Sequence, residues 1–339
     1  MLQPIDYITQ AYKELKKTEI PLRVVSLFSG CGGLDLSFHK ANYEAVFAND
    51  SDADCVSSYR RNVSNNILHA RVEELDAATL PEAELVIGGW PCQDFSQIGP
   101  KIGISGKRGR LYTHFIDAVR ATKPKVFIAE NVKGIFAVNG GRALRTILKD
   151  CHSIGYDVEP LLVNFADYGV PQFRERVLFI GVPHGTRGPD IEKPLKTSYI
   201  SAGRALSGIP ANAPNQETLK IHPTTVERLR RIPAGGNYKS IPQDDPLYMK
   251  GGRNHVYRRI DPKKPATTLI ANGGGGTWGY HYPEPRALTN RERARLQGFP
   301  DDFEFVGGVS SVRRQIGNAV PPVGMIKIVN AVTEWLKER

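Results

Sequence analysis

Short apolar runs separated by longer mixed segments mark the first half of the chain from Arg23 onward. The runs are Val24–Phe28, Ala45–Ala48, Leu85–Ile87, Val126–Ala129 and Val177–Val182. Runs of this length that alternate with segments of helical pattern indicate strands and helices in turn. The order predicts a parallel, doubly wound α/β sheet with helices on both faces.

Helical periodicity marks both ends of the chain. Near the N-terminus, Ile8, Tyr12 and Leu15 recur at helical spacing among Lys and Glu, which predicts a short amphipathic helix. The same spacing returns in Thr289–Gln297 and in Val323–Leu336. We therefore expect the two ends of the chain to complete the larger domain.

The region between these parts has a different character. From about residue 185 to about residue 285 the chain is rich in Pro, Gly, Arg and Lys and has only short apolar runs. This composition is typical of irregular structure. We expect one domain from residues 1–184 and 286–339, and a smaller irregular domain from residues 185–285.

Charge and cysteine content narrow the function classes. The 339 residues carry a formal net charge of +10, and the pI is about 9.4, which suits a polyanionic partner or simply a well-solvated basic protein. Four cysteines show no C-x-x-C pair and no His/Cys cluster at metal spacing, so we expect neither a metal site nor a disulfide framework. No leader-like segment and no apolar stretch of membrane-spanning length is evident, and a cytoplasmic protein is expected.

A glycine turn follows the first predicted strand. Phe28-Ser29-Gly30-Cys31-Gly32-Gly33-Leu34 joins that strand to a helix, a geometry that lets a nucleotide-like ligand approach bare backbone. Asp50 follows about 20 residues later, where a carboxylate can accept hydrogen bonds from ribose hydroxyls. NAD enzymes share this layout, but Leu36 occupies the last glycine position of their usual spacing. S-adenosyl-L-methionine (AdoMet) is therefore the better candidate, and a turn that needs glycine only for steric reasons is the alternative.

A cysteine lies just beyond another predicted strand. Gly88-Gly89-Trp90-Pro91-Cys92-Gln93 follows Leu85–Ile87, at the sheet edge where open α/β sheets bind ligands. Glu130 ends the next strand, and Gln172-Phe173-Arg174-Glu175-Arg176 begins a later one. Each could serve structure alone, with Glu130 as a helix cap and the arginines in surface ion pairs. Their common position at strand ends favours a site.

Taken in order, these segments resemble the cytosine-C5 DNA methyltransferase family from about Arg23 to the C-terminus. The matching motifs are Phe28–Gly33, Pro91–Gln93, Glu130–Val132, Gln172–Arg176, Arg291–Pro300 and Gln315–Pro322. One departure precedes Leu75: the family usually has an acidic residue there for the adenine amino group, whereas this chain has Arg71, with Glu73 two residues on.

The resemblance implies a Rossmann-like methyltransferase sheet with a target recognition domain, and it implies roles for individual residues. AdoMet would be bound, and released as S-adenosyl-L-homocysteine, by a set of nine residues. The set is Phe28, Gly30, Gly32, Gly33, Leu34, Asp50, Pro91, Asn318 and Ala319. The catalytic residues would be Cys92 as nucleophile to cytosine C6, Glu130 at N3, Arg176 at O2 and Arg174 as a cation that favours the thiolate.

Double-stranded DNA is the implied substrate, with the target cytosine flipped out of the stack. The segment 94–110 combines glycines with Lys and Arg, which predicts a loop that closes over DNA. The expected DNA contacts are Gln93, Ser96, Lys107, Arg108, Arg253, Arg258 and Thr268. Further arginines of the second domain, including Arg259, are available for phosphate or guanine.

Likeness to bacterial modification methylases implies a location in the bacterial cytoplasm, associated with the nucleoid, and makes a cognate restriction endonuclease a candidate partner. A monomer is expected, because half-site symmetry is unnecessary when the base of one strand is modified at a time. Three other functions fit parts of the pattern. A tRNA cytosine methyltransferase would use the same chemistry, a DNA-binding relative without activity would keep the fold, and an NAD-dependent oxidoreductase would share the glycine turn. The basic insert, the intact Cys92, Glu130 and Arg176, and the glycine spacing argue against each in turn.

Overall fold

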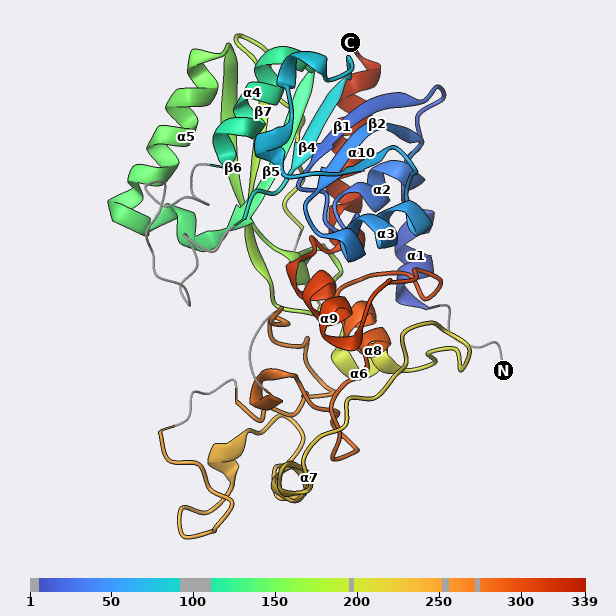
Figure 1. The fold of residues 1–339 in the computed structure, drawn as a ribbon, viewed down its shortest axis with the longest axis vertical. Coiled ribbons are helices and arrows are strands. Elements are labelled where there is room, and N and C mark those ends of the chain that lie inside the picture. The colour runs from blue at the N-terminus through green and yellow to red at the C-terminus, as the bar shows by residue number, and fades with distance from the viewer. Residues whose placement is uncertain (1–5, 92–110, 195–197, 252–255, 272–274) are drawn as a thin grey trace. The chain divides into compact units, whose positions relative to one another are not determined.

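A computed structural model describes residues 6–91, 111–194, 198–251, 256–271 and 275–339 (Figure 1). The chain forms two compact units. The first contains Met1–Lys13, Ala166–Arg174 and Leu195–Gly324, and the second contains Glu14–Phe165, Glu175–Pro194 and Met325–Arg339. The chain therefore passes several times between the units. The division into a catalytic domain and a target recognition domain with a boundary near residues 185 and 285 stays a prediction.

A seven-stranded sheet organises the second unit, in the order β3-β2-β1-β4-β5-β7-β6. Its strands are β1 (Leu22–Leu27), β2 (Tyr43–Asp50), β3 (Ile67–His69), β4 (Leu85–Gly88), β5 (Val126–Val132), β6 (Tyr156–Asn164) and β7 (Glu175–Pro183). All five predicted strands are confirmed. The expectation of a parallel sheet is wrong at one edge, because β7 pairs antiparallel with both β5 and β6.

Helices cover the sheet. They are α2 (Asp35–Lys40), α3 (Ala53–Asn62), α4 (Tyr112–Thr122), α5 (Arg142–Ser153) and most of α10 (Pro322–Lys337). Apolar side chains of α4 and α5 pack against alternate residues of the central strands, among them Val25, Val86 and Phe127. The intervening residues, such as Ile87 and Ile128, are also fully buried. Both faces of the central strands are therefore covered, as a doubly wound sheet requires.

The first unit contains the helices α1 (Tyr7–Lys13), α6 (Ala202–Leu206), α7 (Pro223–Arg230), α8 (Asn290–Leu296) and α9 (Val309–Asn318). Short 3-10 turns and irregular segments make up much of the rest. Three arginines of α8 compensate for the missing backbone pairing: Arg291, Arg293 and Arg295 are almost fully buried and donate to carbonyl oxygens of surrounding loops. Buried carbonyl groups need such donors where no ladder supplies them.

The predicted helices near the chain ends are confirmed as α1, α8 and α10. Thr289 caps α8 through a capping box, in which its hydroxyl oxygen accepts from the Glu292 N–H and the Glu292 carboxylate accepts from the Thr289 N–H. Among the residues that the structure describes, no helix is long and apolar enough to span a membrane.

Candidate functional site

The glycine turn between β1 and α2 has unusual backbone geometry. Phe28, Gly30 and Gly32 have positive φ angles of 54°, 56° and 91°. Positive φ is costly for a bulky residue such as Phe28, and such strain concentrates at functional sites. Gly33 and Leu34 follow and are buried at the start of α2.

The two glycines of this turn face different surroundings. A Cβ on Gly30 would have no atom within 4 Å, whereas a Cβ on Gly32 would lie 2.7 Å from Val63 Cγ2 and 3.1 Å from the Tyr59 ring. Gly32 is therefore needed because α3 packs against the turn. Gly30 leaves its backbone open on the side away from the protein, the kind of surface that a cofactor can approach.

Asp50, at the end of β2, lies next to this open backbone. Its Oδ2 accepts from the Gly30 N–H at 2.8 Å, and its Oδ1 accepts from the Asp52 N–H at 2.9 Å. Burial raises the pKa of Asp50, and these backbone donors oppose the increase. The adjacent Asn49 accepts from the Phe28 N–H at 3.3 Å and so ties the strained residue to β2. An acidic group beside bare backbone fits the ribose and the amino-acid part of AdoMet.

A second carboxyl group near the turn was not expected from the sequence. Asp35, the first residue of α2, is buried, and burial raises its pKa to about 6. Its Oδ1 accepts from the Tyr59 hydroxyl at 2.9 Å. The pattern gave no signal for this group, because an Asp at a helix start looks like an ordinary favourable charge near the N-terminus.

The segment that leads toward Cys92 is well packed up to Pro91. Trp90 is buried against the rings of Tyr112, Phe115 and Phe179, and its carbonyl accepts from the Asn131 side chain at 3.3 Å. Pro91 is half-buried. Cys92 itself lies outside the described residues, as does the predicted DNA loop at 94–110. Of the other cysteines, Cys31 and Cys151 are buried and Cys55 is half-buried.

Glu130 and Arg176 form an ion pair at the same sheet edge. Arg176 Nε lies 2.8 Å from Glu130 Oε1, and the two side chains are 14% and 12% exposed. The pair exists because β7 runs antiparallel to β5, which brings the first residues of β7 beside the last residues of β5. A Cβ on Gly89 would lie 3.3 Å from Glu130 Oε2, so the carboxyl group lies against the backbone three residues before Cys92.

Arg174, two residues before Arg176 in the chain, is placed in the first unit and is 1% exposed. Its Nη2 donates to the carbonyl oxygens of Gly317, Asn318 and Ala319 at 3.0, 3.4 and 3.0 Å. The Ala319 carbonyl also accepts from Gln297. Arg174 thus holds the turn between α9 and α10 that carries two expected cofactor contacts, while its predicted effect on the Cys92 thiolate stays a prediction.

The expected DNA contacts are only partly described. Thr268 is exposed, and its hydroxyl donates to the Phe173 carbonyl at 2.6 Å, while Arg258 is half-buried. Gln93, Ser96, Lys107, Arg108 and Arg253 lie outside the described residues. Arg259 corrects the expectation for that arginine: it is buried and donates to carbonyl oxygens of Leu229, Ile232, His281 and Tyr282, so its guanidinium group is not available to DNA.

Arg71, the departure from the family pattern, precedes a 3-10 turn at Val72–Glu74. The Arg71 backbone N–H donates to Glu74 Oε2 at 3.1 Å, and Arg71 is exposed. Glu73 and Glu74 lie in the first turn of this element. The acidic side chains of this segment are therefore Glu73 and Glu74, which follow Arg71 in the chain, and the position that the family usually fills with an acidic residue holds Arg71.

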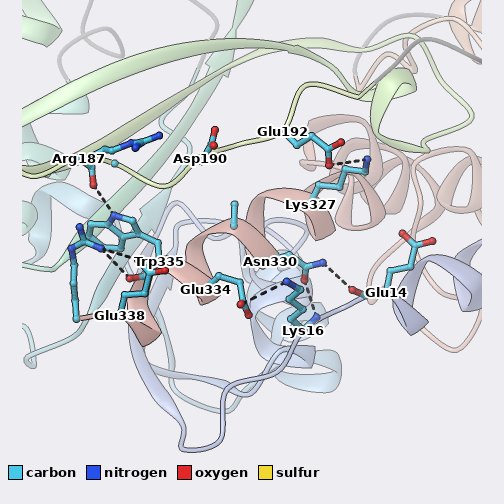
Figure 2. A pocket seen from close by; sticks show the side chains of 13 residues that line it. Glu14, Lys16, Arg187, Asp190, Glu192, Lys327, Asn330, Glu334, Trp335 and Glu338 are labelled. Carbon is cyan, nitrogen blue, oxygen red and sulfur yellow. Dashed lines mark hydrogen bonds and ion pairs between the residues drawn. The ribbon is translucent and has the colours of Figure 1, made fainter.

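A cavity of about 580 Å³ lies elsewhere in the second unit, between α10 and the segment after β7 (Figure 2). Its walls contain groups of both signs, including the ion pairs Lys16–Glu334 at 3.7 Å and Lys327–Glu192 at 3.9 Å. It is lined by none of the residues expected to bind AdoMet or cytosine.

Comparisons with known proteins identify the family of the chain. Residues 22–334 match the family described as C-5 cytosine-specific DNA methylase. The chain is 51% identical to the type II methyltransferase M.NgoFVII of Neisseria gonorrhoeae over 91% of this chain and 86% of the relative. It is 40% identical to the type II methyltransferase M.BbvI of Brevibacillus brevis over 90% and 89%.

Solved structures share the fold. An E. coli prophage protein described as a DNA modification methyltransferase superposes with a TM-score of 0.72 at 25% identity, over 93% of this chain and 99% of that one. The Dnmt2 methyltransferase of S. pombe superposes with a TM-score of 0.67 at 15% identity, over the same shares of the two chains, which supports the fold alone. On the strength of the family match along nearly its whole length, this chain belongs to the C-5 cytosine-specific DNA methylases.

Proposed function

We propose that the protein transfers a methyl group from AdoMet to C5 of a cytosine flipped out of duplex DNA, through a covalent bond between Cys92 and C6. The observation that carries the proposal is the meeting of Glu130 and Arg176 at the sheet edge, beside the strand that leads to Cys92. In the cell, the protein would act as a modification methylase.

Cysteine chemistry is required because cytosine C5 is a poor nucleophile. When the Cys92 thiolate adds to C6, the electron pair of the C5–C6 double bond becomes available at C5, as in an enamine. AdoMet, when bound, supplies a methyl group activated by the positive sulfonium. After transfer, C5 loses its proton and Cys92 is eliminated as a thiolate, which restores the double bond. Water is the proposed acceptor of that proton.

Glu130 and Arg176 would act on the ring during the addition step. Negative charge then spreads toward N3 and O2. A hydrogen bond to N3 from Glu130, after its carboxylate has taken up a proton, and one from Arg176 to O2 would stabilise this charge. Their mutual ion pair supports this arrangement, because it holds both side chains at one edge before the base arrives.

The cofactor would lie along the glycine turn. The open backbone at Gly30 and the carboxylate of Asp50 support this position, with Phe28, Gly32, Gly33, Leu34 and Pro91 around it. Asn318 and Ala319 would complete the site from the turn that Arg174 holds. The DNA contacts predicted at Arg258 and Thr268, and at the residues outside the described ranges, belong to the same proposal.

The proposal is tested by incubating the chain with labelled AdoMet and either duplex DNA or tRNA. We expect label in DNA, none with Cys92→Ser, and an unchanged rate with the matched variant Cys55→Ser. Transfer to tRNA alone, or transfer that survives Cys92→Ser, would refute it. DNA with 5-fluorocytosine at the target gives a second readout, because fluorine cannot leave as a proton does, so a stable adduct on the Cys92 peptide is expected. Bisulfite sequencing of treated DNA identifies the target sequence.

The monomeric state, the cognate endonuclease and the nucleoid location are parts of this proposal. Light scattering of the purified chain tests the first. Protection of treated DNA against an endonuclease encoded beside the gene tests the second, and fluorescence of a tagged chain over the nucleoid of a bacterial cell tests the third.

A further inference from the structure

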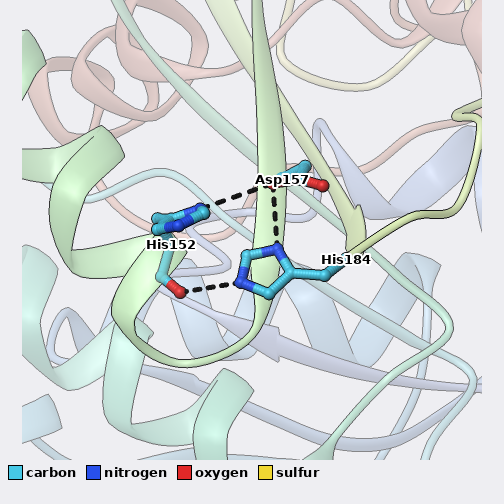
Figure 3. Close-up of side chains that lie close together, drawn as sticks. All are labelled: His152, Asp157 and His184. Atoms are coloured by element: carbon cyan, nitrogen blue, oxygen red, sulfur yellow. Dashed lines mark hydrogen bonds and ion pairs between the residues drawn. The ribbon is translucent and has the colours of Figure 1, made fainter.

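Three potential metal ligands meet on the surface of the second unit, away from the residues discussed above. His152 lies on α5, Asp157 on β6 and His184 just after β7 (Figure 3). One ligand atom from each side chain lies within 4.8 Å of the others. Since His152 and His184 are 32 positions apart, no local spacing in the sequence marks the cluster.

The hydrogen bonds of His184 leave a nitrogen in an unfavourable position. Its Nε2 lies 3.0 Å from the His152 carbonyl oxygen, which can only accept, so Nε2 carries a proton. In the neutral ring the lone pair of Nδ1 then points to Asp157 Oδ1, 2.9 Å away. Two acceptors at this distance need a positive charge between them. A second proton on the ring or a metal ion can provide it.

His152 favours the metal ion. Its Nδ1 lies 3.4 Å from the same oxygen, Asp157 Oδ1. A tetrahedral zinc site with bonds of about 2.0–2.1 Å separates its ligand atoms by about 3.3 Å. The contact from His152 already has this separation, and the one from His184 needs to lengthen by only a few tenths of an ångström. A proton shared by His184 and Asp157 would satisfy those two groups alone and would not account for the position of His152.

The backbone that carries these side chains is fixed by independent hydrogen bonds. The His184 N–H donates to the Gly155 carbonyl at 2.9 Å, and the Gly155 N–H donates to the His152 carbonyl at 3.0 Å. The other Asp157 oxygen, Oδ2, accepts from the Gly185 N–H at 3.3 Å, which leaves Oδ1 directed to the two rings. The hydrogen bond from His184 Nε2 to a carbonyl is the usual way in which proteins orient a metal-binding imidazole.

We propose that His152, Asp157 and His184 bind a divalent ion of the first transition series, of which Zn²⁺ is the representative. Two imidazole nitrogens and one carboxylate oxygen are a common ligand set for such ions. The side chains are 71%, 53% and 41% exposed, so an ion can enter from solvent and water can complete its coordination. The ion would link the end of α5 to the β6–β7 pair.

The test uses the untagged full-length chain, because an affinity tag would itself bind the ion. Chelator-treated protein is titrated with Zn²⁺ at pH 8 against a chromophoric indicator, and in parallel with Co²⁺, whose visible absorption reports the ligand field. The variants are His152→Gln, Asp157→Asn and His184→Gln. His39→Gln, at an exposed histidine in the last turn of α2, is the matched control. Circular dichroism checks that each variant is folded.

We expect one tight equivalent of Zn²⁺ for the wild type and for His39→Gln. Each ligand variant should bind at least about ten-fold more weakly and lose the Co²⁺ absorption, because even changes to the groups behind a metal ligand cost about 10–100-fold in affinity. The absence of a stoichiometric site in the wild type would mean that a proton occupies the cluster, and it overturns the proposal. So does a loss of less than ten-fold in any ligand variant relative to His39→Gln.

Discussion

The two glycines of the turn after β1 allow folding and cofactor binding to be separated by the same chemical change. Gly30→Ala and Gly32→Ala each add one methyl group at a residue with positive φ, 56° and 91° respectively. Their surroundings differ, because open space surrounds the first Cβ while Val63 and Tyr59 would crowd the second. We predict that Gly32→Ala destabilises the protein and that Gly30→Ala weakens AdoMet binding.

The magnitudes follow from these contacts. An alanine at positive φ costs about 1–2 kcal/mol, partly offset by the lower entropy of the unfolded chain. Gly30→Ala should therefore lower the free energy of unfolding by about 1 kcal/mol. Gly32→Ala adds the overlap with Val63 Cγ2 at 2.7 Å, and forced packing of this kind costs a further ~1–3 kcal/mol. Its total is about 2–4 kcal/mol.

Urea unfolding measures the first effect. With a slope of about 2–3 kcal/mol per M, the midpoint should fall by about 1–2 M for Gly32→Ala and by less than about 0.5 M for Gly30→Ala. Of the three tryptophans, Trp90 and Trp335 lie in the second unit and Trp278 in the first, so intrinsic fluorescence reports the unfolding of both units.

Calorimetric titration with AdoMet measures the second effect. Gly30→Ala should weaken binding at least ten-fold, about 1.4 kcal/mol, because its methyl group enters the open space at the Gly30 backbone, where the proposed cofactor would lie. Folded Gly32→Ala should lose less affinity for AdoMet than Gly30→Ala, because its added methyl group points toward Val63 and Tyr59 rather than into open space. The reasoning is refuted if Gly30→Ala binds AdoMet normally, or if both variants lose the same stability.

Three further predictions concern charged groups. The pKa of Asp35 is about 6 in the folded protein and 3.8 in its usual state, so the folded protein holds a proton that the unfolded chain loses, and stability falls as pH rises between these values. Asp35→Asn should remove up to about 3 kcal/mol of this fall between pH 4 and pH 7, as measured by urea unfolding, and equal pH dependence in both proteins would contradict the prediction. Glu130→Gln and Arg176→Ala should each slow methyl transfer about 10²–10³-fold in single-turnover assays with an unchanged AdoMet Kd, and losses below ten-fold would argue against their contact with the base. Arg174→Lys keeps the charge but removes the guanidinium donors to three carbonyl groups, so it should lose about 2–4 kcal/mol of stability with an unchanged pH–rate profile. Arg174→Gln removes the charge as well and should move the pH–rate profile to higher pH, because the cation favours the Cys92 thiolate. An unchanged profile in Arg174→Gln would assign Arg174 to structure alone.

The sequence was most informative where strands are buried on both faces. Such strands are continuous apolar runs, and β1, β4, β5 and β7 were predicted from them. The less buried β2 was predicted from its apolar part, Ala45–Ala48. The strand β6 was missed because it lies at the sheet edge, with Asp157, Glu159 and Pro160 among its residues and only partial burial. The strand β3 has only three residues, of which two are exposed, and it gives no pattern to read.

Positions at strand ends could be predicted, but their pairing could not. Glu130 and Arg176 were chosen from the sequence as groups at one edge, yet their ion pair depends on β7 running antiparallel to β5, which no local pattern encodes. Arginines were the hardest residues to interpret. Arg259 and Arg174 look like surface cations in the sequence, and both are buried because irregular backbone around them needs hydrogen-bond donors.

The interleaving of the two compact units limits how this chain can be recombined with its relatives. The chain changes unit after Lys13, Phe165, Arg174, Pro194 and Gly324. A single crossover between two genes therefore cannot exchange one unit without dividing at least one of the two, and any junction between residues 14 and 324 divides both. Replacement of the whole first unit by that of a relative needs several coordinated breakpoints. A replacement confined to the long continuous stretch from residue 195 to residue 324 needs only two. Chimaeras built with junctions at those two positions should retain folding more often than chimaeras with one junction anywhere in the chain.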